Sequence, residues 1–197
     1  MMRPRAVRFT FARFLAMVVV AIGLLSGAAT ASAQPSVVIL VRHAERAKTP
    51  PDDPGLTPEG MQRARDLATV LAGTHVGVIV TTQLKRTQLT AAPIAEKTGA
   101  KSIIVPTGTR EVHADSVAAA VRRVAAGEAV LVVGHSNTIP AIIAALGGPQ
   151  LPDLCDAQYS NLFVLVFSGT APPRFIQSGY GVADAPDAAS CRDPKKP

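Results

Sequence analysis

Short apolar runs alternate with stretches of helical spacing along most of the chain. Four runs rich in Val, Ile and Leu predict strands that are buried on both faces of a sheet. These runs are Val37–Val41, Val76–Val80, Ile103–Val105 and Ala129–Val133. Between them, apolar residues recur every three or four positions, which is typical of a helix with one buried face.

Capping residues mark the ends of the predicted helices. Thr57 is a good N-cap with Pro58 at the first helical position, and Gly99 is suited to ending a helix. The four expected helices are Pro58–Leu71, about Arg86–Lys97, a third that begins near Asp115 or Ser116 and ends before Gly127, and about Thr138–Leu146.

Two further apolar runs near the end of the chain predict a hairpin. Leu162–Phe167 and Arg174–Gln177 are joined by the turn Ser168–Pro173. Regular alternation of strands and helices followed by a hairpin predicts the α/β class. We expect a three-layer sandwich, with a mainly parallel sheet, helices on both faces and one antiparallel edge strand.

The first 33 residues have the pattern of a secretory signal peptide. Four arginines without any acid precede the apolar stretch Phe14–Leu25, and Ala31-Ser32-Ala33 provides a cleavage site. An uncleaved membrane anchor is the alternative, although the short apolar core favours cleavage. We expect a signal peptide at 1–33, one domain at 34–182 and an irregular tail at 183–197, in a protein exported to the periplasm.

Removing this leader changes the charge of the chain. The full chain carries +6, but four of its twenty Lys and Arg lie in the leader, so residues 34–197 have sixteen basic against fourteen acidic residues. A net charge of +2 gives no basis for binding nucleic acid or a membrane surface. After the leader, no segment is long and apolar enough to span a membrane. The sequence does not define an oligomeric state.

The chain has two cysteines, Cys155 and Cys191. An even number in an exported protein favours a disulfide between them, and two unrelated thiols are the alternative. Closing this loop would stabilise the fold by about 3–4 kcal/mol on a chain-entropy model.

Polar clusters follow three of the predicted strands. Arg42-His43 follows the first, Thr81–Thr87 with Arg86 follows the second, and His135-Ser136-Asn137 follows the fourth. The ends of parallel strands meet at one crevice of an α/β sheet, so these groups are expected to converge. Two guanidiniums, two imidazoles and a helix N-terminus together favour an oxyanion, and phosphate is the obvious ligand.

These clusters resemble the motifs of the histidine phosphatase superfamily, the phosphoglycerate mutase-like proteins. Four blocks carry the resemblance in the expected order, across most of residues 34–197. They are Arg42-His43-Ala44-Glu45, Leu56-Thr57-Pro58-Glu59-Gly60 with Gln62 and Ala64, Leu84-Lys85-Arg86-Thr87 with Thr90-Ala91, and Gly134-His135-Ser136-Asn137.

The resemblance implies catalytic roles for these residues. His43 would attack phosphorus and form a phosphohistidine that water hydrolyses. Arg42, Arg86 and His135 would hold the phosphoryl oxygens as charge redistributes in the transition state, with Ser136 also at the phosphate site. The two arginines should disfavour protonation of His43, and we expect a backbone carbonyl to fix its tautomer.

Two positions depart from the family pattern. Thr49 stands where many relatives have a phosphate-binding Asn, so we assign it to the phosphate site only by position. Glu111 is the first candidate for the proton donor that larger relatives carry after the third strand. Asp115 is expected instead to be the N-cap of the next helix, and His113 is either a donor or an exposed loop residue.

The expected function is an exported, metal-independent phosphatase that acts on a small phosphorylated substrate without a cofactor. The His residues lack metal-ligand spacing, two guanidiniums would repel a cation, and Ser136 is not in a nucleophile elbow. The alternatives are a non-catalytic phosphate- or phosphosugar-binding protein and a phosphoglycerate mutase-type phosphotransferase, which would need a lid insertion. His75 is expected to be structural, and Glu45 with Arg46 to form a surface pair or line the mouth of the site.

Overall fold

The computed structural model describes residues 35–169 and 171–185. Six strands form one sheet in the order β3-β2-β4-β1-β5-β6. The strands are β1 (Val37–Arg42), β2 (Val76–Thr81), β3 (Lys101–Ile104), β4 (Ala129–Gly134), β5 (Asn161–Val166) and β6 (Arg174–Gly179). All six overlap the predicted runs, but β3 begins two residues before Ile103 and is a mostly exposed edge strand, so the prediction that this strand is buried on both faces is wrong.

The sheet is parallel from β3 through β2 and β4 to β1, whereas β5 pairs antiparallel with β1, and β6 pairs antiparallel with β5. The structure therefore confirms the α/β class and the antiparallel pairing at one edge. In the register of β1 and β4, Arg42 lies opposite Gly134. The residues that follow these two strands consequently leave the sheet side by side.

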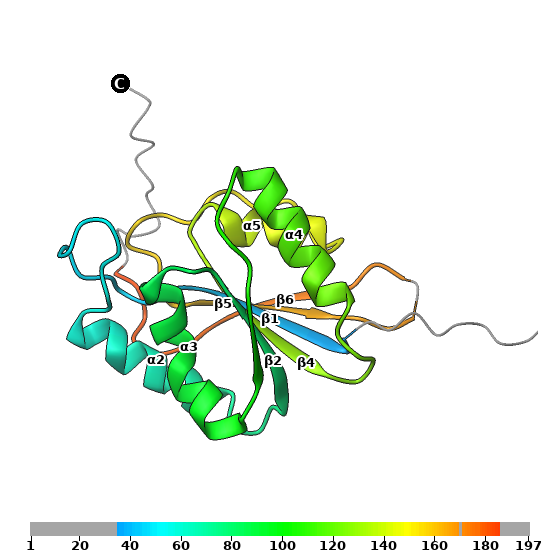
Figure 1. The fold of residues 1–197 in the computed structure, drawn as a ribbon. Coiled ribbons are helices and arrows are strands. Elements are labelled where there is room, and N and C mark those ends of the chain that lie inside the picture. Colours follow the sequence, from blue (N-terminus) through cyan, green and yellow to red (C-terminus); the bar gives the residue numbers. More distant parts are fainter. Residues whose placement is uncertain (1–34, 170, 186–197) are drawn as a thin grey trace, which may run out of the picture. The chain divides into compact units, whose positions relative to one another are not determined.

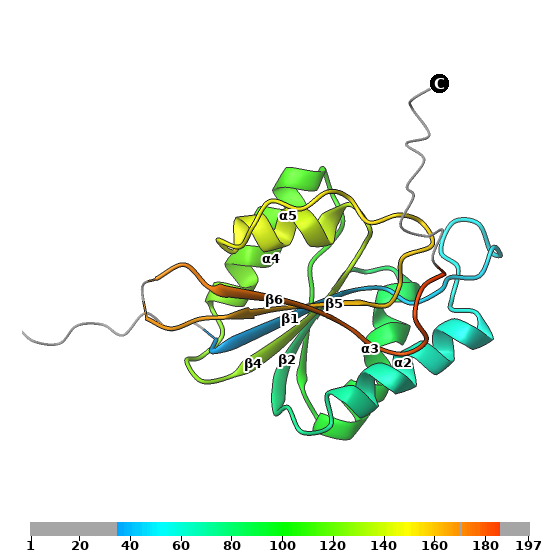
Figure 2. The same ribbon diagram turned by 180° about the vertical axis from the view of Figure 1, so that it is seen from behind.

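Helices cover both faces of the sheet (Figures 1 and 2). They are α2 (Pro58–Val70), α3 (Lys85–Thr98), α4 (Arg110–Arg122) and α5 (Thr138–Ala145). One apolar core lies between the sheet and α4 with α5, and a second lies between the sheet and α2 with α3. Strand β1 contributes alternate side chains to both cores, which is why its apolar run is continuous.

Predicted capping residues set two of the helix ends. The Thr57 hydroxyl accepts a hydrogen bond from the Gly60 N–H at 3.1 Å, and Pro58 is the first residue of α2. Gly99 ends α3 in the left-handed conformation with φ 67°, which costs glycine little.

The predicted start of α4 near Asp115 is wrong. The helix begins at Arg110 with Thr109 as its N-cap residue, and Asp115 is an exposed residue inside the helix. The buried positions His113, Ala114, Val117, Ala118 and Val121 recur every three or four residues. The buried face of the helix thus begins with His113 and Ala114, before Asp115.

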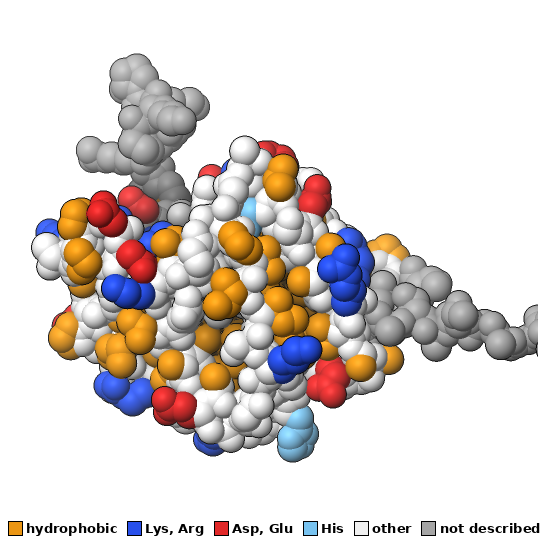
Figure 3. All heavy atoms as spheres, viewed as in Figure 1, with side chains coloured by type: hydrophobic (Ala, Val, Ile, Leu, Met, Phe, Trp, Pro, Cys, Tyr) orange, Lys and Arg blue, Asp and Glu red, His pale blue; other side chains and the backbone are white. Residues whose placement is uncertain are grey.

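Charges of both signs are scattered over the face seen in Figure 3, with no extended basic area. None of the helices among the described residues is long and apolar enough to cross a membrane. The predicted signal peptide lies outside the described residues. In the predicted tail, residues 183–185 are irregular, and residues 186–197 also lie outside the described part.

Candidate active site

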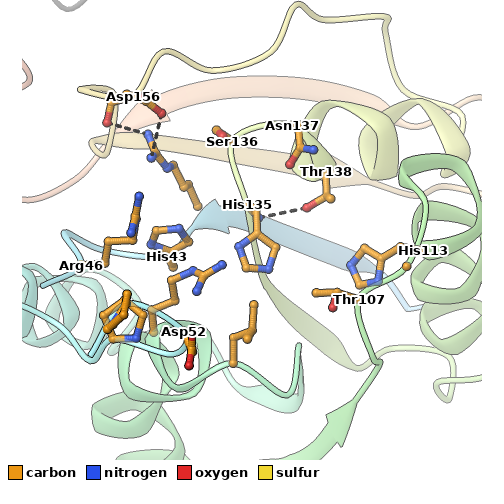
Figure 4. A pocket seen from close by; sticks show the side chains of 16 residues that line it. His43, Arg46, Asp52, Thr107, His113, His135, Ser136, Asn137, Thr138 and Asp156 are labelled. Carbon is orange, nitrogen blue, oxygen red and sulfur yellow. Dashed lines mark hydrogen bonds and ion pairs between the residues drawn. The ribbon is translucent and has the colours of Figure 1, made fainter. Parts of the chain in front are cut away.

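The two histidines predicted to converge lie next to each other at the ends of β1 and β4. The backbone N–H of His43 donates to the carbonyl oxygen of Gly134 at 2.9 Å, which extends the pairing of the two strands. The rings of His43 and His135 meet edge to face with centroids 5.4 Å apart (Figure 4). The pairing of β1 with β4 thus makes neighbours of two residues that are 92 positions apart in the sequence.

The ring of His43 is held in one tautomer. Its Nδ1 lies 2.8 Å from the carbonyl oxygen of Ala44, which can only accept, so Nδ1 carries the proton and Nε2 keeps its lone pair. Burial lowers the pKa of His43 to about 3, with Arg42, His135 and Arg86 acting in the same direction. His43 is therefore a neutral imidazole at physiological pH, as its expected role as a nucleophile requires.

Thr90 ties the segment after His43 to helix α3. Its hydroxyl accepts from the Ala44 N–H at 2.9 Å and donates to the Arg86 carbonyl oxygen at 2.7 Å. The side chain is fully buried. Because one hydroxyl bridges the backbones of both segments, the positions of His43 and Arg86 are coupled.

His135 is fixed mainly by residues that follow β2 and β4. Its backbone N–H donates to the Thr138 hydroxyl at 3.0 Å, and its Nε2 lies 3.4 Å from the Thr82 hydroxyl. Burial lowers the pKa of His135 to about 4, with further contributions from Arg86, His113 and Arg42. A neutral His135 can still offer one N–H to an anion.

The guanidinium of Arg42 is oriented by the loop before β5. One terminal nitrogen donates to the carbonyl oxygens of Cys155, Asp156 and Gln158 at 2.7, 3.0 and 3.1 Å. The group also lies over the Tyr159 ring, 4.2 Å from its centroid. Burial is the main cause that lowers the pKa of Arg42. The buried Nε atom has no partner within the described part of the chain.

Arg86 stands in the first turn of α3. Its Nε atom is also buried without a partner among the described residues. Burial lowers the pKa of Arg86, and Arg46 adds to this effect. Asp53 caps the helix from another loop, because its carboxylate accepts from the Lys85 N–H at 2.9 Å. Among the described residues, no carboxylate is hydrogen-bonded to the Arg86 guanidinium, although the charge of Asp53 opposes the lowering of its pKa.

These groups line one cavity of about 510 Å³. The cavity brings together most of the residues predicted from the sequence and several others. Its walls include Arg42, His43, Arg86, His135 and Ser136, together with Arg46, Asp52, His113, Asn137, Thr138 and Asp156. Arg46 thus lies at the mouth of the site, which was one of its two predicted positions.

Two predicted site residues do not reach this cavity. Thr49 is exposed in the loop between β1 and α2, which projects because Ala47 and Gly55 close its base by a backbone hydrogen bond of 2.9 Å. Glu111 is exposed in the first turn of α4 and is not part of the cavity wall. The early start of α4 instead turns His113 inward, so His113 is not an exposed loop residue.

Glu45 forms an ion pair that the sequence did not reveal. The Arg63 Nε atom lies 2.9 and 3.0 Å from its two carboxylate oxygens, and Arg63 also donates to the carbonyl oxygens of Tyr180 and Val182. Arg63 is buried on α2 next to Ala64 and Leu67. The sequence feature that could have indicated this ion pair is a basic residue on the apolar face of α2. Gly60 is required nearby, because a Cβ atom there would collide with the Glu45 carbonyl oxygen.

The loop that holds Arg42 is itself anchored twice. Cys155 is disulfide-bonded, whereas Cys191 lies outside the described residues, so the Cys155–Cys191 pairing stays a prediction. The Asp184 carboxylate accepts from the N–H groups of Tyr159 and Ser160 at 2.9 and 3.0 Å. Neither Tyr159 nor Asp184 was predicted, because both act through contacts between segments distant in the sequence.

Across residues 35–169 and 171–185, no group of three or more His, Cys, Asp or Glu side chains is arranged to hold a metal ion. The site is instead built from arginines and neutral imidazoles. Such an arrangement binds a tetrahedral oxyanion through charge-assisted hydrogen bonds.

Residues 38–117 match the histidine phosphatase superfamily (branch 1). A segment of 65 residues is 45% identical to Phosphoserine phosphatase 1 of Hydrogenobacter thermophilus, and it covers 30% of this chain and 31% of that protein. The similarity thus spans about a third of the length of this relative. Over residues 38–117, which include His43 and Arg86, the chain is similar to members of that superfamily. The family match ends before His135, which the structure places beside His43.

Solved structures share the fold. SixA from Agrobacterium tumefaciens is 25% identical with a TM-score of 0.54, over 75% of this chain and 98% of that one. SixA from Nakamurella multipartitia is 24% identical with a TM-score of 0.57, over 74% and 96%. A protein histidine phosphatase SixA complexed with tungstate is 18% identical with a TM-score of 0.56, over 73% and 96%.

Proposed function

We propose that this protein hydrolyses phosphomonoesters through a phosphohistidine intermediate on His43, without a metal ion or another cofactor. One observation carries the proposal above the others. The Nε2 lone pair of a neutral, tautomer-locked His43 lies in a cavity with two arginines whose buried Nε atoms have no partner among the described residues. A nucleophile beside an oxyanion site is the requirement for phosphoryl transfer to the protein.

In the first step, the phosphoryl group of the substrate binds to Arg42, Arg86 and His135. The Nε2 atom of His43 attacks phosphorus, and the bond from phosphorus to the leaving oxygen breaks. Negative charge on the three equatorial oxygens is stabilised by donors that are already in place, so little reorganisation accompanies the reaction.

In the second step, water attacks phosphorus, the bond to Nε2 breaks and phosphate is released. While Nε2 carries the phosphoryl group, the ring has a proton on Nδ1 and is cationic. The hydrogen bond from Nδ1 to the Ala44 carbonyl oxygen stabilises that cation. The same contact therefore prepares the nucleophile and supports the intermediate.

The proposed substrate is a small phosphorylated compound. The relative that matches 65 residues is named a phosphoserine phosphatase, and a related fold is named a glucosyl-3-phosphoglycerate phosphatase. The cavity of about 510 Å³ has room for a compound of this size. We further propose that the protein acts in the periplasm, on the basis of the leader pattern in residues 1–33.

Turnover of p-nitrophenyl phosphate tests the proposal. The wild-type protein should release nitrophenol with or without a chelator, and His43→Ala should abolish turnover. His75→Ala is the matched control, because His75 is exposed in the turn before β2. Phosphate binding without turnover would instead indicate a binding protein. Turnover that depends on a diphosphorylated primer would indicate a mutase.

A further inference from the structure

We propose that His113 is the catalytic acid that protonates the leaving oxygen of the substrate. The inference rests on the proposed function, because it assigns one step of that reaction to a residue on helix α4. Nothing in the phosphohistidine chemistry of His43 requires the acid to be at this position.

His113 is a buried titratable group with one free ring nitrogen. Its side chain is 2% exposed, and its Nδ1 lies 2.9 Å from the Pro106 carbonyl oxygen, to which it donates. The donor at Nδ1 is thereby committed to the backbone, which leaves Nε2 as the atom that can exchange a proton. The residue lines the same cavity as His43 and His135.

The position of His113 suits the geometry of displacement. In phosphoryl transfer, the attacking atom and the leaving oxygen lie roughly in line on opposite sides of phosphorus. Figure 4 shows His135 between His43 and His113, so His113 lies on the side away from the nucleophile. A phosphoryl group held beside His135 would therefore direct its leaving oxygen toward His113.

The carboxylates near the site are less well placed for this task. Glu111 is exposed and is not in the cavity wall, whereas Asp52 and Asp156 line the cavity but are exposed at its rim. The titratable group that interacts with His113 is His135 across the cavity, whereas Arg110 on the same helix pairs with Asp153 at 2.8 Å.

His113 gives up one proton in the first step of the reaction and regains one in the second. As the bond from His43 Nε2 to phosphorus forms and the bond from phosphorus to oxygen breaks, the Nε2 proton of His113 moves to the leaving oxygen. The products are an alcohol and a neutral His113. In the second step this neutral imidazole takes a proton from the attacking water, which restores its cationic form as phosphate is released.

The test compares substrates with good and poor leaving groups. His113→Asn places an amide N–H where Nδ1 was, so the bond to Pro106 is kept and Nε2 is removed. We expect kcat/KM to fall by roughly 10²–10⁴-fold on phenyl phosphate, and to change little on dinitrophenyl phosphate, whose leaving group needs no proton. We expect kcat/KM of the wild type on phenyl phosphate to fall at alkaline pH, and this fall should disappear in the variant.

Glu111→Gln is the matched control, because it changes a neighbouring titratable group on the same turn of α4. It should leave both substrates unaffected, and selective loss in Glu111→Gln rather than in His113→Asn would overturn the proposal. Equal loss on both substrates in His113→Asn would assign His113 a structural role and also refute it.

Two further measurements separate the role of His113 from a folding defect of the variant and from a failure of the proposed function. In the wild type alone, an alkaline fall of kcat/KM that is equal for both substrates would contradict the proposal. Phosphohistidine on His43 should still accumulate in His113→Asn with dinitrophenyl phosphate. Its absence in the wild type would refute the proposed function itself, whereas its presence with no leaving-group effect would refute only the role of His113.

Discussion

Removing the Arg86 guanidinium should make the protein more stable and much less active. Arg86 lies near Arg42 and Arg46, and all three line the cavity. Its buried Nε atom has no partner within the described residues. In the free protein these features cost stability, whereas in the complex with phosphate they supply binding. Arg86→Met keeps most of the side-chain volume and removes the charge.

The structure sets the size of both effects. A buried donor without a partner costs about 1–3 kcal/mol, and the lower end applies because Arg86 is only partly buried. A gain of about 1 kcal/mol corresponds to a rise in Tm of about 2–4 °C for a domain of this size. Loss of one oxyanion donor should lower kcat by roughly 10²–10³-fold.

Differential scanning fluorimetry with and without phosphate measures both consequences. The wild type should gain stability as phosphate is added, because phosphate binds only to the folded state, and Arg86→Met should lose most of this gain. Lys85→Met is the control, because Lys85 is the adjacent exposed cation and is not in the cavity wall. A variant with a lower Tm and an unchanged response to phosphate would refute the reasoning.

Three further predictions concern single side chains. Neutral His43 is the reactive form, and burial lowers its pKa to about 3. The rate of its phosphorylation, measured by rapid quench, should therefore stay level as pH falls through 6.5. A loss of rate centred at pH 6.5 would contradict this. Arg63→Met leaves Glu45 without its partner and should lower the free energy of unfolding in urea by about 3 kcal/mol, whereas the exposed control Arg65→Met should not. Thr90→Val removes two hydrogen bonds and should lower kcat by roughly 10-fold. Thr90→Ser keeps the hydroxyl and should recover kcat. Equal rates for the two variants would show that the hydroxyl does not position His43.

The fold was predictable because the central strands β1, β2 and β4 are almost entirely apolar. Strand β4 is buried at every position, so the run Ala129–Val133 carries no competing pattern. The convergence of His43 and His135 was predictable for the same reason, since both follow such runs. General rules for parallel sheets then place them at one edge.

The parts that were missed depend on contacts between distant segments. The start of α4 was predicted too late because His113 occupies a position on the buried face where an aliphatic residue is expected. The orientation of Arg42 depends on three carbonyl oxygens more than one hundred positions away, in a loop with no motif of its own. Backbone acceptors have no sequence signature, so no pattern could have indicated them.

The most direct test is to identify the phosphorylated atom during turnover. The wild-type protein is mixed with dinitrophenyl phosphate and quenched in alkali, which preserves phosphohistidine. Peptide mass spectrometry then locates the phosphoryl group, and phosphorus NMR identifies the ring nitrogen. We expect phosphate on Nε2 of His43 and none in His43→Ala. Phosphate on His135 or on Nδ1 of His43, or turnover with no phosphorylated residue, would contradict it.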